Sequence, residues 1–159
     1  MRYVRRVLQP GETIVYATKL HWLIYIHTIL LLIACIILAG AAIATSDSQN
    51  ISLALGIAAV IFTLLALSAG LRAFIRRATT ELAVTDHRVI YKSGLLSRHT
   101  IEMNRDKVES VDVDQSLLGR IFGYGTVVVR GTGGSLEPIR NIGDPLTFRS
   151  HITAGPGGP

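Results

Sequence analysis

The 159-residue sequence contains a single cysteine, Cys35, so neither a disulfide framework nor a multi-thiolate metal site can form within one chain. Its five histidines are scattered, at positions 21, 27, 87, 99 and 151, and no two have the i, i+4 spacing of a helical zinc site. The glycine-rich stretch 131–134 lacks the Lys-Ser/Thr of a phosphate loop, and 119–125 lacks dinucleotide-motif spacing. These absences predict a protein without a metal or another cofactor.

Charge is missing from two long apolar runs. Residues 22–44 and 51–75 contain no charged side chain before Arg72, and only six polar residues, 45–50, separate them. About 20 apolar helical residues cross the ~30 Å hydrocarbon layer of a bilayer. The runs therefore predict a transmembrane helical hairpin over 22–75, in which small residues let the helices approach closely. Trp22 and Tyr25 are expected to anchor the first helix at the membrane interface.

Basic residues flank this hairpin on both sides and are absent from its connector. They are Arg2, Arg5, Arg6 and Lys19 before it, and Arg72, Arg76 and Arg77 at its end. Cytoplasmic flanks collect Lys and Arg, so we expect a multi-pass protein of the cytoplasmic (inner) membrane with both termini in the cytoplasm. Arg72 can extend along its helix and place its guanidinium at the interface.

The positive charge of the chain lies entirely beside the predicted membrane. Residues 1–78 contain seven basic and two acidic side chains, whereas residues 79–159 contain nine of each. Basic residues next to a bilayer attract anionic lipids, while a nucleic-acid binder carries its charge on the folded domain. We therefore expect membrane lipids, and not nucleic acid, among the partners.

Two processing signals offer an alternative to the first span. Residues 32–35, Leu-Ile-Ala-Cys, resemble a lipoprotein cleavage box, and 42–44, Ala-Ile-Ala, resemble a signal-peptidase site. Against cleavage, the segment before the run is 21 residues long and contains Glu12, and the apolar run continues past Cys35.

Outside the hairpin the sequence is strand-like. In the N-terminal segment 1–21 a turn at 10–12 precedes a strand expected over 13–18, and polar–apolar alternation predicts strands over 81–85, 88–92, 100–103, 108–114, 126–130 and 136–140. Apolar residues at helical spacing within 115–122 predict a helical turn or an irregular connector. Asp144 and Pro145 are the expected N-cap and first residue of a short closing helix. The Gly/Pro-rich tail 153–159 is expected to be disordered.

Three motifs within 79–152 resemble the bacterial pleckstrin-homology (PH) domain family: Leu-x-Val-Thr-Asp-x-Arg at 82–88, Ser-Gly-Leu-Leu-Ser-Arg at 93–98 and Gln-Ser-Leu-Leu-Gly-Arg at 115–120. The preceding pair of helices is similar to the membrane-anchored members of that family. The resemblance implies a membrane-anchored α+β protein, in which a transmembrane hairpin is followed by a small PH-like barrel, partly open, or a two-sheet roll plugged by a C-terminal helix. The closing helix is short, so the plug is either incomplete or completed by the N-terminal strand. The first hairpin of the domain lacks the basic pattern of eukaryotic phosphoinositide binders.

The same resemblance implies a binding or assembly module without catalytic activity. Its expected partners are membrane lipid, an unidentified membrane or cytoplasmic protein, and a second copy of the chain. Arg72, Arg76 and Arg77 are candidate contacts to anionic headgroups, joined by Arg98, Arg105 and Lys107 if their loops face the bilayer.

Two other functions stay open on the sequence alone. The first is an accessory or regulatory subunit of a membrane transport or export system, in which the hairpin is the working part. The second is an enzyme in which Asp112 and Asp114 hold a divalent cation. Alternation along a strand places these two side chains on one face, which is also the pattern of a solvated sheet.

Overall fold

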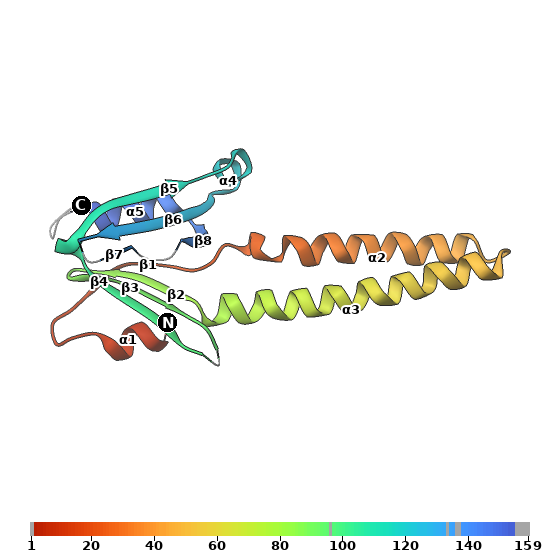
Figure 1. Ribbon diagram of the computed structural model, residues 1–159, viewed down its shortest axis with the longest axis horizontal. Coiled ribbons are helices and arrows are strands. Elements are labelled where there is room, and N and C mark those ends of the chain that lie inside the picture. The colour runs from red at the N-terminus through yellow and green to blue at the C-terminus, as the bar shows by residue number, and fades with distance from the viewer. Residues whose placement is uncertain (1, 96, 133, 136–137, 155–159) are drawn as a thin grey trace. The chain divides into compact units, whose positions relative to one another are not determined.

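The computed structural model (Figure 1) describes residues 2–95, 97–132, 134, 135 and 138–154. The chain divides into two compact units. One unit, called the domain below, combines Met1–His21 with Arg76–Pro159, and the other is the helical pair Trp22–Ile75.

The helical pair begins with a short 3-10 turn, η1 (Trp22–Tyr25), which leads into α2 (Ile26–Ala44). The connector turns the chain back into α3 (Gln49–Thr79), whose last residues already belong to the domain. Both helices are long and apolar enough to cross a membrane. Side chains link them: Cys35 Sγ lies 3.0 Å from Thr63 Oγ1, and the Ser52 hydroxyl donates to the Ala42 carbonyl at 2.8 Å. The two runs thus contact each other as predicted, but the close approach expected from their small residues is not general, because a Cβ built at Gly40 or Gly56 would have no neighbouring atom within 4 Å.

The first sheet of the domain contains four antiparallel strands in the order β1 (Ile14–Thr18), β2 (Glu81–Thr85), β3 (Arg88–Ser93) and β4 (His99–Asn104). β1 precedes the helical pair in sequence and β2 follows it, yet the two strands pair directly, with Thr18 opposite Leu82. The segments on either side of the apolar helices therefore build one sheet.

The second sheet is formed by β5 (Val108–Asp114), β6 (Tyr124–Gly131), β7 (Gly134–Ser135) and β8 (Ile139–Gly143). β6 is central and pairs with β5 on one side and with β7 and β8 on the other. The 3-10 turn η2 (Arg105–Lys107) connects the two sheets, and α4 (Leu117–Phe122) connects β5 to β6.

Two further helices cover the sheets. α5 (Pro145–Thr153) packs against strands of both sheets and buries Phe148 and Ile152 among the core valines. Tyr16 of β1 stacks on His151 of α5, with ring centroids 4.5 Å apart, so the N-terminal strand does help to close the core. α1 (Arg2–Val7) covers the opposite face of the first sheet, where Val4 packs against Ala83 and Ile90. Figure 1 shows α5 beside the second sheet and α1 beside the first.

These elements form an α+β fold of two antiparallel sheets, and not a closed barrel. Between the described strands of the two sheets there is only one isolated bridge, Leu20 to Ile142. Of the two architectures implied by the family resemblance, the two-sheet arrangement is therefore the one observed.

The predicted strands over 81–85 and 108–114 coincide with β2 and β5. Three predictions were wrong or incomplete. No helix was predicted over α1. Asp144 precedes α5 as expected, but it has a φ of 51° and its side chain makes no capping hydrogen bond. The strand predicted over 136–140 extends instead from Ile139 to Gly143, with 136 and 137 outside the described residues, as are 155–159 of the tail.

Candidate functional site

The strand directions give the domain two chemically different ends. Antiparallel strands reverse at each turn, so alternate turns lie at the same end of a sheet. One end, the junction end, holds His21, the end of α3, the end of β3, the start of β4, the segment 115–123 with α4, and the start of α5. The distal end holds residues 8–13, the turn at 86 and 87, η2 and Thr132. At ~3.3 Å per residue, strands of this length separate the ends by ~15–25 Å.

At the junction end, the chain is fixed where it continues into the apolar helices. The His21 N–H donates to the Asn141 carbonyl at 2.7 Å, and the His21 ring stacks on Tyr124 with centroids 5.6 Å apart. On the other side, the Thr80 hydroxyl donates to the Arg76 carbonyl at 2.7 Å. Burial, followed by the charge of Arg77, lowers the pKa of His21 below its usual value, so this ring is neutral near neutral pH.

Three of the predicted lipid or partner contacts lie at this junction end. Arg76 is exposed and Arg77 is half-buried in the last turn of α3. Arg98 is exposed directly before β4, and its guanidinium carbon lies 5.5 Å from the centre of the Tyr3 ring. The structure therefore places at the same end of the domain cations that are separated by more than 20 positions in the sequence.

The other predicted contacts are placed elsewhere. Arg72 belongs to the helical pair, where its Nη2 donates to the Ser68 hydroxyl at 3.3 Å. Trp22 and Tyr25 both lie in η1, with Trp22 exposed and Tyr25 half-buried.

Arg105 and Lys107 lie in η2, at the distal end of the domain. The Arg105 guanidinium donates to the carbonyls of His151 and Ile152, with Nη2 3.0 Å and 3.3 Å from the two oxygens. Carbonyls in the last turn of a helix lack partners within the helix, and a cation satisfies them well. Arg105 thus closes the C-terminus of α5, whereas Lys107 is exposed.

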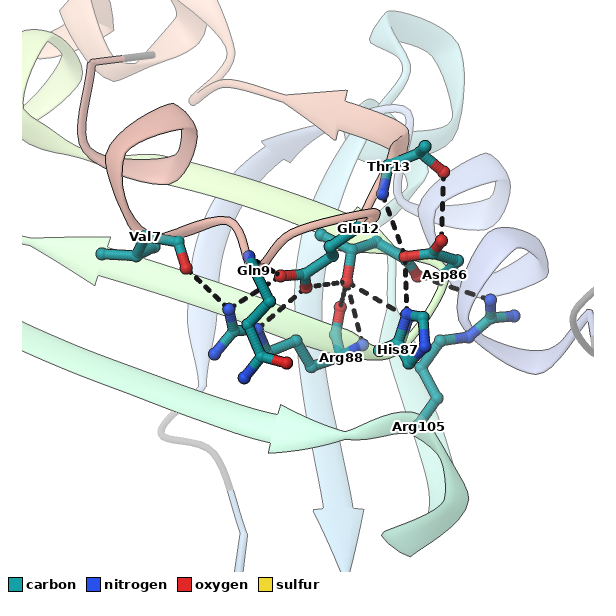
Figure 2. Close-up of polar contacts among 9 residues, drawn as sticks. Val7, Gln9, Glu12, Thr13, Asp86, His87, Arg88 and Arg105 are labelled. Carbon is teal, nitrogen blue, oxygen red and sulfur yellow. Dashed lines mark hydrogen bonds and ion pairs between the residues drawn. The ribbon is translucent and has the colours of Figure 1, made fainter.

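The distal end also contains a polar network that the sequence did not reveal (Figure 2). Its centre is Glu12, whose side chain is only 2% exposed. The Glu12 carboxylate accepts from the Thr85 hydroxyl at 2.7 Å, from the Gln9 N–H at 2.8 Å, and from Arg88 Nε and Nη2 at 2.9 and 2.8 Å. These donors, with Arg88 the strongest, lower the pKa of Glu12 to about 2 against the cost of burial.

Arg88 completes the network by joining three chain segments. Its Nη2 also donates to the Val7 carbonyl at 2.7 Å, and its Nη1 bonds to the Glu102 carboxylate on β4. Two carboxylates therefore neutralise this guanidinium, and Arg88 is not available as an anion-binding group. The network attaches the segment that precedes the helical pair to the sheet that follows it.

A second contact in Figure 2 reinforces this attachment. Asp86 accepts from the Thr13 N–H at 3.1 Å and lies 2.8 Å from His87 Nδ1. This pairing lowers the pKa of Asp86 and raises that of His87. A cavity of about 490 Å³ borders the same surface, lined by Gln9, Asp86, His87, Arg88, Asn104 and Asp106.

Asp112, a candidate cation ligand in the sequence, forms an ion pair with Arg130. Its carboxylate accepts from Arg130 Nε at 2.9 Å across the β5–β6 ladder. Among the described residues, no group of three or more His, Cys, Asp or Glu side chains is placed to hold a metal ion.

Comparison with known proteins gives one match. A family model described as the bacterial PH domain matches residues 15–155. The match begins within β1, includes both apolar helices and extends past α5. Neither a curated protein nor a solved structure matches the chain.

Proposed function

The chain belongs to the bacterial PH domain family, and we propose that it is a membrane-anchored binding and assembly module of the cytoplasmic membrane. Membership of this family supports a binding or assembly role. In the proposal, α2 and α3 cross the bilayer, and the domain lies on the cytoplasmic side, where it binds a protein partner, a second copy of the chain or anionic lipid.

The observation that carries this proposal is the pairing of β1 with β2 across the apolar helices. Strands that form one ladder must lie on the same side of a membrane, so the chain between them has to cross twice or not at all. In the most apolar 18-residue window of the first helix, no residue is buried within the structure. In the corresponding window of the second helix, 11% of the residues are buried. A core helix of a soluble protein would be mostly buried, so this exposure favours two crossings.

The energetics favour the same conclusion. Side chains such as Ile36, Ile43 and Leu53 are more than 60% exposed, and transferring a side chain of this kind from water to an apolar medium is worth about 1.5–3 kcal/mol. More than a dozen large apolar side chains of the helical pair are at least 38% exposed, and seven of them are more than 60% exposed. Lipid chains would shield all of these side chains from water. The flanking Arg76 and Arg77 favour a cytoplasmic location for the domain.

Anchoring would change how the domain binds. A tethered domain meets a membrane-bound partner at high effective concentration, so that contacts too weak to last in solution become significant. The edge strands β4 and β5 offer backbone groups for strand addition by such a partner.

The test is purification of the full chain in a mild detergent, with the co-purifying proteins and lipids identified and the mass of the complex measured. The proposal predicts that alkaline washing leaves the protein in the membrane fraction and that the purified form is either a defined oligomer, a stoichiometric complex or a complex enriched in anionic lipid. A protein that is released by washing, or that purifies as a monomer with no partner and no lipid preference, would contradict it.

A second candidate function is an accessory subunit of a membrane transport or export system. It is favoured by an apolar groove of about 830 Å³ between α2 and α3, where the small residues Ala42 and Gly56 lie among larger aliphatic side chains such as Ile57. Small residues that line such a groove allow a helix of another membrane protein to pack closely. Photo-crosslinking from Val60 to a transporter subunit would support this function, and crosslinks to lipid alone would argue against it.

A further inference from the structure

The exposed apolar side chains of the domain are gathered at its junction end. Among the described residues of the domain, seven large hydrophobic side chains are exposed, and one of them, Val15, lies in the distal half of β1. The other six are at the junction end: Leu95, Leu117, Leu118, Ile121, Phe122 and Leu146. The distal turns instead present polar side chains, such as those of Asp106 and Lys107.

Four of these six belong to α4 and share one face of it. Leu117, Leu118, Ile121 and Phe122 are 79%, 58%, 74% and 47% exposed. At 100° per residue they occupy an arc of about 140°. Both ends of the helix are capped: the Ser116 hydroxyl accepts from the Gly119 N–H at 3.1 Å, and Gly123 ends the helix with a φ of 70°. A helix that faces water usually carries polar side chains on its exposed face. The exposed face of α4 is apolar instead.

The helix α4 lies close to the point where the chain continues into the apolar helices. Tyr124 directly follows α4 and stacks on His21, the residue before Trp22, where the apolar helices begin. The Asp144 N–H also donates to the Gly123 carbonyl at 2.9 Å, which joins the end of α4 to the start of α5. The apolar face is therefore built next to the point where the chain leaves the domain.

The charge at the junction end complements an anionic surface. Lys19, Arg76, Arg98 and Arg120 are exposed there, and Arg77 is half-buried. Among the described residues, the carboxylates at this end are Asp114, Asp144 and Glu81, of which Glu81 accepts from the N–H groups of Tyr3 and Val4. Apolar side chains surrounded by an excess of cations are the pattern of segments that enter the headgroup layer of an anionic membrane.

We propose that the apolar face of α4 inserts into the interfacial layer of the bilayer and so fixes the orientation of the domain on the lipid surface. This inference rests on the proposed function, because it requires the helical pair to span the membrane. It goes beyond that function by assigning a lipid-contacting surface on the domain itself.

Site-directed spin labelling of the full chain tests this assignment. Cys35→Ser removes the native thiol and keeps a hydroxyl beside Thr63. Single cysteines are then introduced as Ile121→Cys on α4, Lys107→Cys at the distal end and Leu64→Cys in the helical pair, all at exposed positions. Each protein is reconstituted into vesicles of equal parts phosphatidylcholine and phosphatidylglycerol, and collision rates with oxygen and with a water-soluble nickel chelate are measured.

The expected result is a ratio of oxygen to nickel collisions at Ile121 that is well above the ratio at Lys107 and approaches that at Leu64. A ratio at Ile121 equal to that at Lys107 would overturn the inference. Low collision rates with both reagents at Ile121 would also overturn it, because that label would be buried against protein. A label at Leu64 that is open to nickel would contradict the membrane-spanning hairpin itself, so the two failures are distinguishable.

Discussion

Glu12→Gln tests how the two separated parts of the domain are held together. The substitution keeps the shape of the side chain but removes the charge that pairs with Arg88 in a site only 2% exposed. The pKa of Glu12 falls from its ordinary value of 4.5 to about 2 on folding. At about 1.4 kcal/mol per pKa unit, the native state stabilises the ionised carboxylate by ~3 kcal/mol.

This stabilisation has a defined pH dependence. Because the folded-state pKa lies below the unfolded one, the contribution is present above pH 4.5 and is lost as the pH falls toward 2. The stability difference between the wild-type protein and Glu12→Gln should therefore be largest near neutral pH and should shrink across this acidic window.

Native-state hydrogen exchange on the full chain in detergent measures the effect. At pH 7 the opening free energy of the β1–β2 ladder, followed at Tyr16 and Leu82, should fall by roughly 2–4 kcal/mol. Glu102→Gln is the matched control, because it removes a carboxylate from the same arginine at a site 30% exposed, where such pairs are worth about 0–1 kcal/mol. Equal protection of β1 in the wild type and Glu12→Gln would refute this account of the network.

Three further substitutions have expected outcomes. Phe148→Ala should lower the free energy of unfolding by about 3–5 kcal/mol, because the ring is fully buried; chemical denaturation would show a smaller loss if α5 did not close the core. Arg105→Gln should cost about 1–3 kcal/mol through the carbonyls of His151 and Ile152, whereas Lys107→Gln, an exposed neighbour, should change the denaturation midpoint little. Gly119→Ala should lower the melting temperature, because a Cβ there would lie 2.7 Å from the Tyr124 carbonyl, and an unchanged melting temperature would mean that β6 can shift.

Alternation and turn residues were sufficient to predict most strands after the helices, because each of these strands pairs with a neighbour close in sequence. β1 was predicted as a strand, and its participation in the closing of the domain was one of two alternatives. Its partner β2 lies beyond the entire helical pair, and no local signal marks so distant a pairing. α1 was missed for a related reason. The Glu81 carboxylate accepts from the N–H groups of Tyr3 and Val4 near its start, and Val4 packs on Ala83.

The candidate contacts show a similar division. Arg76 and Arg77 follow directly from their place at the end of an apolar run. Arg105 and Lys107 were grouped with them, although three strands after Thr80 place η2 at the distal end. Because each strand reverses the chain direction, the number of strands after the junction could have shown that Arg105 and Lys107 lie at the opposite end of the domain from Arg76 and Arg77. The attachment of Arg105 to α5 depends on a contact across more than 40 residues, which no local pattern encodes.

If a membrane-spanning hairpin interrupts the sequence of one domain, the accessibility of single cysteines to a membrane-impermeant thiol reagent will show it. In a Cys35→Ser background, Ser46→Cys probes the connector, while Lys19→Cys and Thr132→Cys probe the two parts of the domain. In intact cells, we expect labelling of Ser46→Cys alone, with the other two cysteines reacting only after the membrane is permeabilised. Labelling of Lys19→Cys and Thr132→Cys from opposite sides of the membrane, or of all three positions from the same side, would contradict it.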